Sequence, residues 1–161
     1  MILFFLRHGE AGMNFPSDFE RELTANGVMA SQSIGEFCKR SNISFTKIIT
    51  SPLIRAKQTA EEVGKFYPNV RIEESEFLTP DTDPKNLFNF LRSTTLGSKI
   101  LLVTHEPFAS TCISTLISGT ESANIVMKTT TLACVKTHGT PVRGNGNLLW
   151  MIPSDMVQQT V

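Results

Sequence analysis

The sequence lacks the features that mark membrane proteins and nucleic-acid-binding proteins. Lys and Arg together number 15, as do Asp and Glu, so the 161 residues carry a formal net charge of zero. Such a chain exerts no global attraction on nucleic acids or anionic membranes. No apolar run approaches membrane-spanning length. The run Ile2–Leu6 is too short for a signal peptide and has no basic region before it. We therefore expect a cytoplasmic protein with neither a nucleic-acid nor a membrane partner.

Cysteine is scarce, and its positions follow no metal-ligand spacing. Cys38, Cys112 and Cys134 are odd in number, and the first two fall on apolar stripes of expected helices. We expect all three to be reduced core residues of an intracellular protein. The three histidines are too few for a zinc site, because His138 lies in an expected hairpin. A Gly-x-x-x-x-Gly-Lys nucleotide loop is also missing. We expect neither a metal nor a cofactor.

Strand-like apolar runs alternate with helical patterns through most of the chain. Strands are expected at 2–6, 46–50, 70–73 and 99–103, and helices at 25–40, 52–66, 84–94 and 107–118. The runs 131–138 and 147–153 flank "GTPVRGNG" and predict an antiparallel hairpin. This order predicts a single domain over residues 1–161. The expected fold is a three-layer α/β/α domain with a mostly parallel central sheet and an antiparallel C-terminal addition.

Two helix starts are marked by capping residues. Ser51 is expected as an N-cap with Pro52 in the first helical position, and Asp83 with Pro84 resembles a second cap.

Cations and imidazoles follow the three most apolar strands. The strand Ile2–Leu6 runs into Arg7 and His8, the second strand is followed one helical turn later by Arg55, and the third runs into His105. Ligands of open α/β sheets bind beyond the carboxyl ends of the strands. If these strands are neighbours, two arginines and two histidines converge on one edge of the sheet. Two helices also begin there, and helix N-termini favour anions.

This set of side chains suits phosphoryl transfer. Two guanidiniums can bind the oxygens of a phosphoryl group, and an unprotonated imidazole can attack phosphorus. A second imidazole, if protonated, can stabilise the charge that develops on those oxygens. A metal is not required, because the arginines supply the positive charge.

Three segments together resemble a known family. "LRHGEA", "SPLIRAKQTA" and "VTHEP" are similar, in order and approximate spacing, to the signature of the histidine phosphatase (phosphoglycerate-mutase-like) superfamily. The short chain, "RELTANG" and "LTPDTD" resemble its SixA-type phosphohistidine phosphatases. The resemblance implies that His8 is the nucleophile and that Arg7, Arg55 and His105 complete the phosphate pocket. Gly9 would let the chain turn sharply beside His8.

Two further residues are candidates for substrate binding. Asn14 lies six residues after His8, where the mutase branch of the superfamily has an asparagine near the phosphate, and a turn residue is an equal alternative. Arg21 matches the arginine of the SixA-type segment, and a surface salt bridge to Asp18 or Glu22 is an equal alternative.

The sequence departs from the larger family at the general acid. Where mutases and many related phosphatases have a glutamate, this chain has Pro80. Glu76, Asp81 and Asp83 lie nearby, and the sequence does not choose among them. An alkoxide leaving group needs a strong proton donor. A phosphohistidine needs less, because its ring is protonated near neutral pH and leaves as neutral imidazole.

The expected substrate follows from these features. Long lid-like insertions are missing, so we expect an open pocket that accepts phosphohistidine on a protein, such as a histidine phosphotransfer domain. A phosphatase of a small phosphorylated metabolite is the alternative, and a mutase would need a more closed site. A non-catalytic phosphate-binding module is a third interpretation, against which the intact His8 argues.

Overall fold

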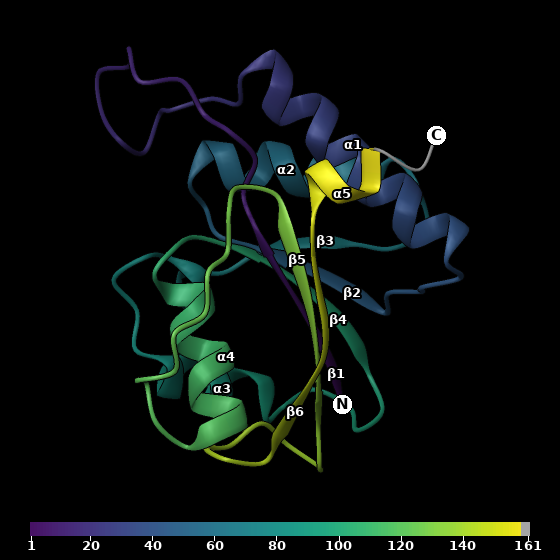
Figure 1. Cartoon of the computed structure of the whole chain (residues 1–161), viewed down its shortest axis with the longest axis vertical. Helices are drawn as coiled ribbons and strands as arrows, with labels where there is room; N and C mark the ends of the chain where they lie inside the picture. The colour runs from purple at the N-terminus through teal and green to yellow at the C-terminus, as the bar shows by residue number, and fades with distance from the viewer. Residues whose placement is uncertain (159–161) are drawn as a thin grey trace.

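The computed structural model describes residues 1–158, which form one mixed sheet between two layers of helices (Figure 1). The strands are β1 (Ile2–Arg7), β2 (Lys47–Thr50), β3 (Ile72–Glu74), β4 (Lys99–Thr104), β5 (Thr131–Thr137) and β6 (Gly146–Pro153). The helices are α1 (Ala25–Arg40), α2 (Ile54–Gly64), the 3₁₀ turn η1 (Glu76–Leu78), α3 (Pro84–Leu91), α4 (Phe108–Ser118) and α5 (Ser154–Gln158). None of the helices within residues 1–158 is long and apolar enough to cross a membrane.

The sheet has the order β3-β2-β4-β1-β5-β6. The pairs β2–β3, β2–β4 and β1–β4 are parallel, whereas β5 runs antiparallel to both β1 and β6. The predicted α/β fold, with a mostly parallel sheet and an antiparallel C-terminal hairpin, is therefore confirmed. The three apolar strands that precede the candidate residues are neighbours, as their convergence requires.

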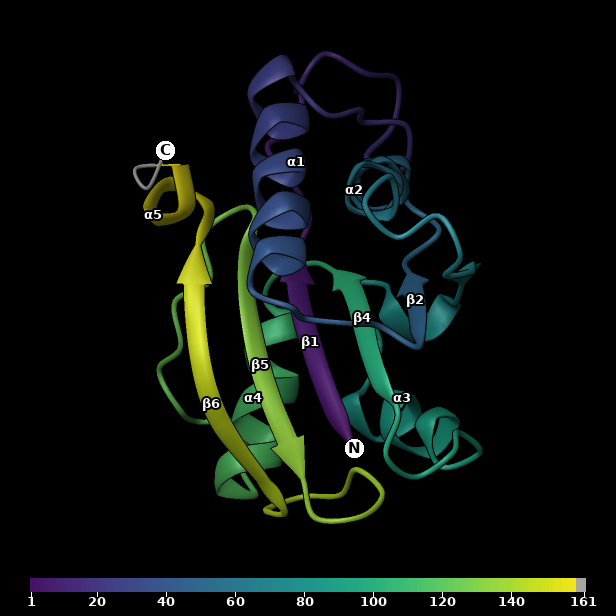
Figure 2. The ribbon, with the colours of Figure 1, turned by 90° about the vertical axis from the view of Figure 1, so that its right-hand side faces the viewer.

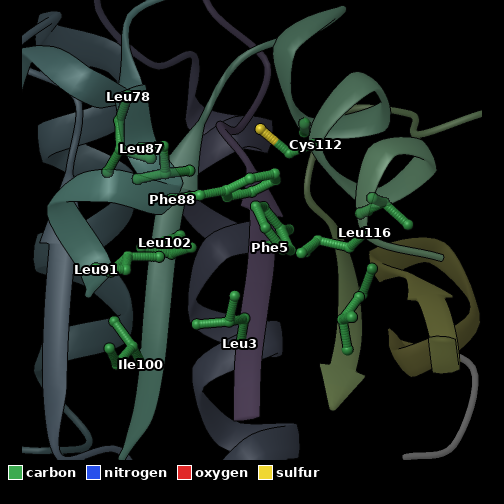
Figure 3. Close-up of a cluster of buried hydrophobic side chains, with 14 of the residues drawn as sticks. Leu3, Phe5, Leu78, Leu87, Phe88, Leu91, Ile100, Leu102, Cys112 and Leu116 are labelled. Atoms are coloured by element: carbon green, nitrogen blue, oxygen red, sulfur yellow. The ribbon is translucent and has the colours of Figure 1, made fainter. Parts of the chain in front are cut away.

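Alternation along β1 separates two cores. Leu3 and Phe5 pack with α3 and α4 on one face of the sheet (Figure 3), whereas Phe4 and Leu6 pack with α1 and α2 on the other. All four side chains are buried. A strand covered on both faces needs a continuous apolar run, which is what β1 has. Figure 2 shows α1 and α2 side by side above this sheet.

Two glycines allow α1 to pack directly on the chain that leaves β1. A Cβ on Gly27 would lie 2.2 Å from the carbonyl oxygen of Glu10, and one on Gly9 would lie 2.8 Å from that of Gly27. Gly9 is not among the glycines with positive φ. The described backbone thus gives Gly9 no left-handed conformation, and the requirement for glycine at this position comes from the close approach of the Gly27 carbonyl.

The start of α2 also differs from the prediction. The helix begins at Ile54, and its N-cap is Leu53 rather than Ser51. Pro52 thus precedes the helix. The Ser51 side chain forms a strong tertiary hydrogen bond instead, and only its longer 3.4 Å contact with the Leu53 N–H resembles capping. The Asp83 cap of α3 is confirmed, since its carboxylate accepts from the Lys85 N–H.

We predict that Gly27→Ala destabilises the protein. Helix propensity alone would favour alanine by about 1 kcal/mol. The new methyl group, however, would overlap the Glu10 carbonyl, and such overpacking typically costs about 1–3 kcal/mol. Urea unfolding should therefore show a net loss of unfolding free energy. The exposed neighbour Asn26→Ala is the matched control and should show no loss. A stability gain in Gly27→Ala would contradict the packing argument.

Candidate active site

Strand register brings the predicted residues to one edge of the sheet. Arg7 pairs with Thr104 across β1 and β4, and Thr50 pairs with Val103 across β2 and β4. The backbone N–H of His8 continues this ladder by donating to the Thr104 carbonyl at 2.9 Å. The residues that follow each strand therefore lie close together, as expected at the carboxyl ends of parallel strands.

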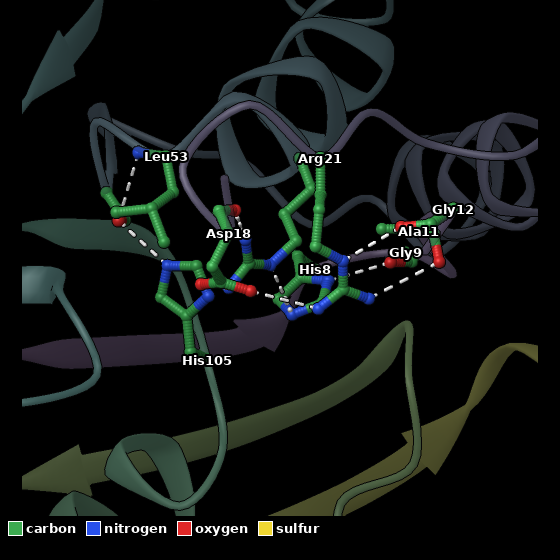
Figure 4. A network of polar contacts seen from close by, with 10 residues as sticks. His8, Gly9, Ala11, Gly12, Asp18, Arg21, Leu53 and His105 are labelled. Carbon is green, nitrogen blue, oxygen red and sulfur yellow. Dashed lines mark hydrogen bonds and ion pairs between the residues drawn. The ribbon is translucent and has the colours of Figure 1, made fainter. Parts of the chain in front are cut away.

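The tautomer of His8 is determined by its two contacts. Arg55 Nε lies 3.2 Å from His8 Nε2, and a guanidinium N–H can only donate. His8 Nε2 is therefore unprotonated and accepts from Arg55 with its lone pair, and the ring proton is on Nδ1, which donates to the Gly9 carbonyl at 2.7 Å. This leaves the Nε2 atom of His8 as the potential nucleophile, with a guanidinium beside it (Figure 4).

Burial keeps His8 neutral. The side chain is 7% exposed, and desolvation is the main cause that lowers its pKa to about 4, with Arg55, Arg7 and Arg21 lowering it further. The hydrogen bond to Gly9 opposes this shift. At neutral pH the imidazole is therefore unprotonated, which is the state a nucleophile requires.

The second imidazole is also neutral in the protein without a bound anion. The centre of the His105 ring lies 5.0 Å from that of His8, and its Nε2 lies 2.8 Å from Ser51 Oγ. Desolvation is the main cause that lowers the pKa of His105 to about 3, and His8 and Arg55 lower it further. The expectation of a protonated second imidazole is thus not met here, because a buried cation beside two guanidiniums is unfavourable.

Arg7 lies at the same edge with part of its guanidinium unused. Its Nη1 donates to the carbonyl of Met127 at 2.8 Å, whereas its buried Nε has no partner. His105 Nδ1 is likewise buried without a partner. Among residues 1–158 only one other buried side-chain N or O atom, Thr131 Oγ1, lacks a hydrogen-bond partner. An unsatisfied buried donor is costly, so Arg7 Nε indicates a place for an acceptor, and His105 Nδ1 is a second polar atom left open in the same site.

Arg21 reaches the site together with Asp18. The Asp18 carboxylate accepts from Arg21 Nη1 at 3.0 Å and from Arg55 Nη2 at 2.9 Å. The backbone carbonyl of Asp18 accepts from Arg55 Nη1 at 2.6 Å. The two interpretations of Arg21 are therefore compatible, since it forms the salt bridge and also lies close enough to His8 to lower its pKa.

Asn14 is exposed, makes no hydrogen bond to any described residue and lies outside this network.

The three acids considered from sequence do not contact these residues. Glu76 and Asp81 are exposed, and Asp83 caps α3. The Asp18 carboxylate does contact this group, since it accepts from Arg55 and Arg21. No local sequence pattern predicts the contact with Arg55. Hydrogen bonds from Arg21 and Arg55 outweigh the desolvation of Asp18 and lower its pKa, so it is ionised at neutral pH. An ionised carboxylate cannot donate a proton.

Protein groups occupy the helix N-termini that we expected to favour an anion. The Ile54 N–H at the start of α2 donates to the Phe19 carbonyl, and the Ser110 N–H in the first turn of α4 donates to the Glu106 carboxylate. Arginines and imidazoles are therefore the principal groups of this site. Within the described part of the chain, no cluster of three or more His, Cys, Asp or Glu residues has metal-binding geometry.

Both imidazoles should resist protonation in solution. NMR titration of the protein without added anions should show His8 and His105 in the neutral form from pH 8 down to about 5, since their pKa values are about 4 and about 3. In urea-unfolded protein both should titrate near 6.5, the ordinary value for a histidine side chain. Because the unfolded state binds these protons first, stability should decrease as pH falls below 6.5. Titration of either folded ring near 6.5 would contradict the burial argument.

Comparison with known proteins agrees with this geometry. Residues 3–79 match the model of the histidine phosphatase superfamily, branch 1. The chain is 29% identical over 156 residues to the phosphohistidine phosphatase SixA of Escherichia coli, covering 94% of this chain and 93% of that protein.

Solved structures show the same fold. A structure of the protein histidine phosphatase SixA complexed with tungstate superposes with a TM-score of 0.88 at 28% identity, over 98% of this chain and 99% of that one. A phosphoserine phosphatase from Entamoeba histolytica in complex with 3-phosphoglyceric acid gives a TM-score of 0.71 at 18% identity, over 93% and 95% of the two chains, and shares the fold. The chain therefore resembles the histidine phosphatase superfamily, its similarity to SixA extends over nearly its whole length, and both findings support a phosphatase.

Proposed function

We propose that this protein hydrolyses phosphohistidine on a protein, without a metal, through a phosphoryl intermediate on His8. The observation that carries the proposal is the pair of partnerless buried atoms, Arg7 Nε and His105 Nδ1, in the same site as the unprotonated His8 Nε2. A phosphoryl group supplies acceptor oxygens to the first two and an electrophilic phosphorus to the third. The similarity to SixA supports the same substrate class.

The reaction would proceed in two displacements. His8 Nε2 attacks phosphorus, and the bond from phosphorus to the substrate imidazole breaks as that imidazole leaves with a proton on its ring. Water then attacks phospho-His8, the new phosphorus–nitrogen bond breaks, and orthophosphate is released. Arg55 Nε, which contacts the His8 lone pair before reaction, would turn to a phosphoryl oxygen as the lone pair is used.

The lack of an acid at the site supports a phosphoramidate substrate. Asp18 is held ionised by two arginines, and the other candidate acids lie elsewhere. An alkyl phosphate would leave as an alkoxide and need a proton from the enzyme. Phosphohistidine brings its proton on its own ring, because imidazole titrates near neutral pH.

One observation favours the small-metabolite alternative. His8 and His105 are only 7% and 1% exposed, and the loop that carries Asp18 lies over Arg55. The pocket is therefore less open than the short chain suggests, because the ion pair fastens this loop to α2. A protein-borne phosphohistidine would have to displace Asp18 from Arg55, which its exposed carboxylate permits.

The nucleophile can be tested by trapping the intermediate. Wild-type enzyme quenched in alkali during turnover should carry an acid-labile phosphoryl group on His8, because a phosphoramidate survives base. His8→Ala should lose turnover by at least about 10³-fold, as in other enzymes that lose a nucleophile. Mass spectrometry locates the label. A label on another residue, or an active variant, would refute the assignment.

The same preparation tests metal independence. Treatment with a chelator should leave the rate unchanged, because the arginines provide the charge. Inactivation that added metal reverses would contradict this part of the proposal.

Substrate choice can be measured as a dependence on the leaving group. kcat/KM should be highest for a phosphohistidine protein, intermediate for an aryl phosphate and lowest for phosphoglycerate. The ratio of aryl to alkyl rates should be the same in wild type and Asp18→Asn, because an ionised Asp18 donates no proton. If phosphoglycerate is the best substrate, the small-metabolite alternative holds. A ratio that rises in Asp18→Asn would identify Asp18 as an acid.

A further inference from the structure

Ser51 has a contact that its expected role as a helix cap does not explain. The residue follows β2, is fully buried and places its Oγ 2.8 Å from His105 Nε2. Among residues 1–158 the one other hydrogen bond of this side chain is accepted from the Leu53 N–H at 3.4 Å. The reaction outlined above uses His105 and leaves the role of Ser51 unassigned.

The protons in this contact can be counted. A serine hydroxyl has one proton to donate and two lone pairs. The Leu53 N–H is a donor and takes one lone pair, so the proton of Ser51 remains available. Within residues 1–158 the acceptor in reach of that proton is His105 Nε2. Donation by Ser51 satisfies its hydroxyl fully and leaves the Nδ1 proton of His105 as the one without an acceptor, whereas donation by Nε2 would leave the hydroxyl proton without one. A phosphoryl oxygen in the site could accept from Nδ1, which favours the first arrangement.

The remaining ring nitrogen of His105 then carries the ring proton. Nδ1 is buried without a partner, and His105 itself is 1% exposed. Figure 4 shows the His105 ring beside the Asp18 side chain, and the ring centres of His105 and His8 lie 5.0 Å apart. A proton on Nδ1 is therefore close to the place where oxygens of a phosphoryl group on His8 would lie.

We propose that Ser51 is a positioning residue, which holds His105 as its Nδ1–H tautomer so that a neutral imidazole donates a hydrogen bond to the phosphoryl group. This inference rests on the proposed function, since it gives the His105 proton a phosphoryl acceptor. It also explains how His105 can act as a donor although its pKa is lowered to about 3. A neutral donor adds a hydrogen bond without adding a further charge beside Arg7 and Arg55.

The tautomer can be observed directly by long-range ¹H–¹⁵N NMR, with His105 assigned from its loss in His105→Gln. Wild type should show a protonated Nδ1 and an unprotonated Nε2. Ser51→Ala should show a mixture of the two tautomers, and Ser51→Thr, which keeps the hydroxyl, should restore the wild-type pattern. A protonated Nε2 in wild type overturns the proposal, even if the variants fail to fold.

Kinetics with an aryl phosphate supply the second readout. Ser51→Ala should lower kcat by roughly tenfold to a hundredfold with a smaller change in KM, as for weakening of an oxyanion donor. Ser114→Ala is the control, because it removes another fully buried serine hydroxyl, on α4, and should leave kcat unchanged.

The two hypotheses fail in different ways. If Ser51→Ala keeps both the tautomer and the wild-type rate, the role of Ser51 is wrong while the phosphatase function stands. If wild type hydrolyses no phosphorylated substrate, the proposed function fails, and with it the phosphoryl acceptor that this inference assumes.

Discussion

The parallel pairing of β2, β4 and β1 is the constraint on which the site depends. Because Arg7 pairs with Thr104 and Thr50 with Val103, the residues just beyond all three strands are held within contact distance by backbone hydrogen bonds. A shift of one residue in either pair would move every side chain of that strand to the opposite face. The apolar side chains on both faces of β1 prevent such a shift, so the packing of the two cores also determines the geometry of the site.

Within that frame, the His8 imidazole is oriented by a neighbour that can only donate. Arg55 can only donate to His8, so the nucleophilic lone pair of His8 is on Nε2. Burial lowers the pKa of both rings, so neither is a cation at neutral pH. In the proposed reaction, one neutral ring attacks and the other donates a hydrogen bond, while the positive charge comes from guanidiniums that do not titrate.

Local sequence patterns predict the parts of this structure that local forces determine. The apolar run of β1 and the helical periodicity over Ala25–Arg40 give their elements to within a residue, and strand ends followed by Arg or His predict the site. Ser51 shows where this fails. Its N-cap pattern is a local preference of about 1 kcal/mol, and a buried hydrogen bond to His105, 54 residues away, competes successfully with it. The place of Asp18 also depends on contacts distant in sequence.

Asp18 explains how a buried arginine is tolerated before any substrate binds. The Arg55 side chain is 5% exposed, and a buried guanidinium without a partner would be strongly unfavourable. Asp18 supplies the opposite charge, yet its own side chain is 62% exposed and remains hydrated. Exchange for a phosphoryl group therefore releases an already hydrated carboxylate into water, while the buried Arg55 keeps an anionic partner throughout. The Asp18 carboxylate can thus neutralise Arg55 until a phosphoryl group takes its place.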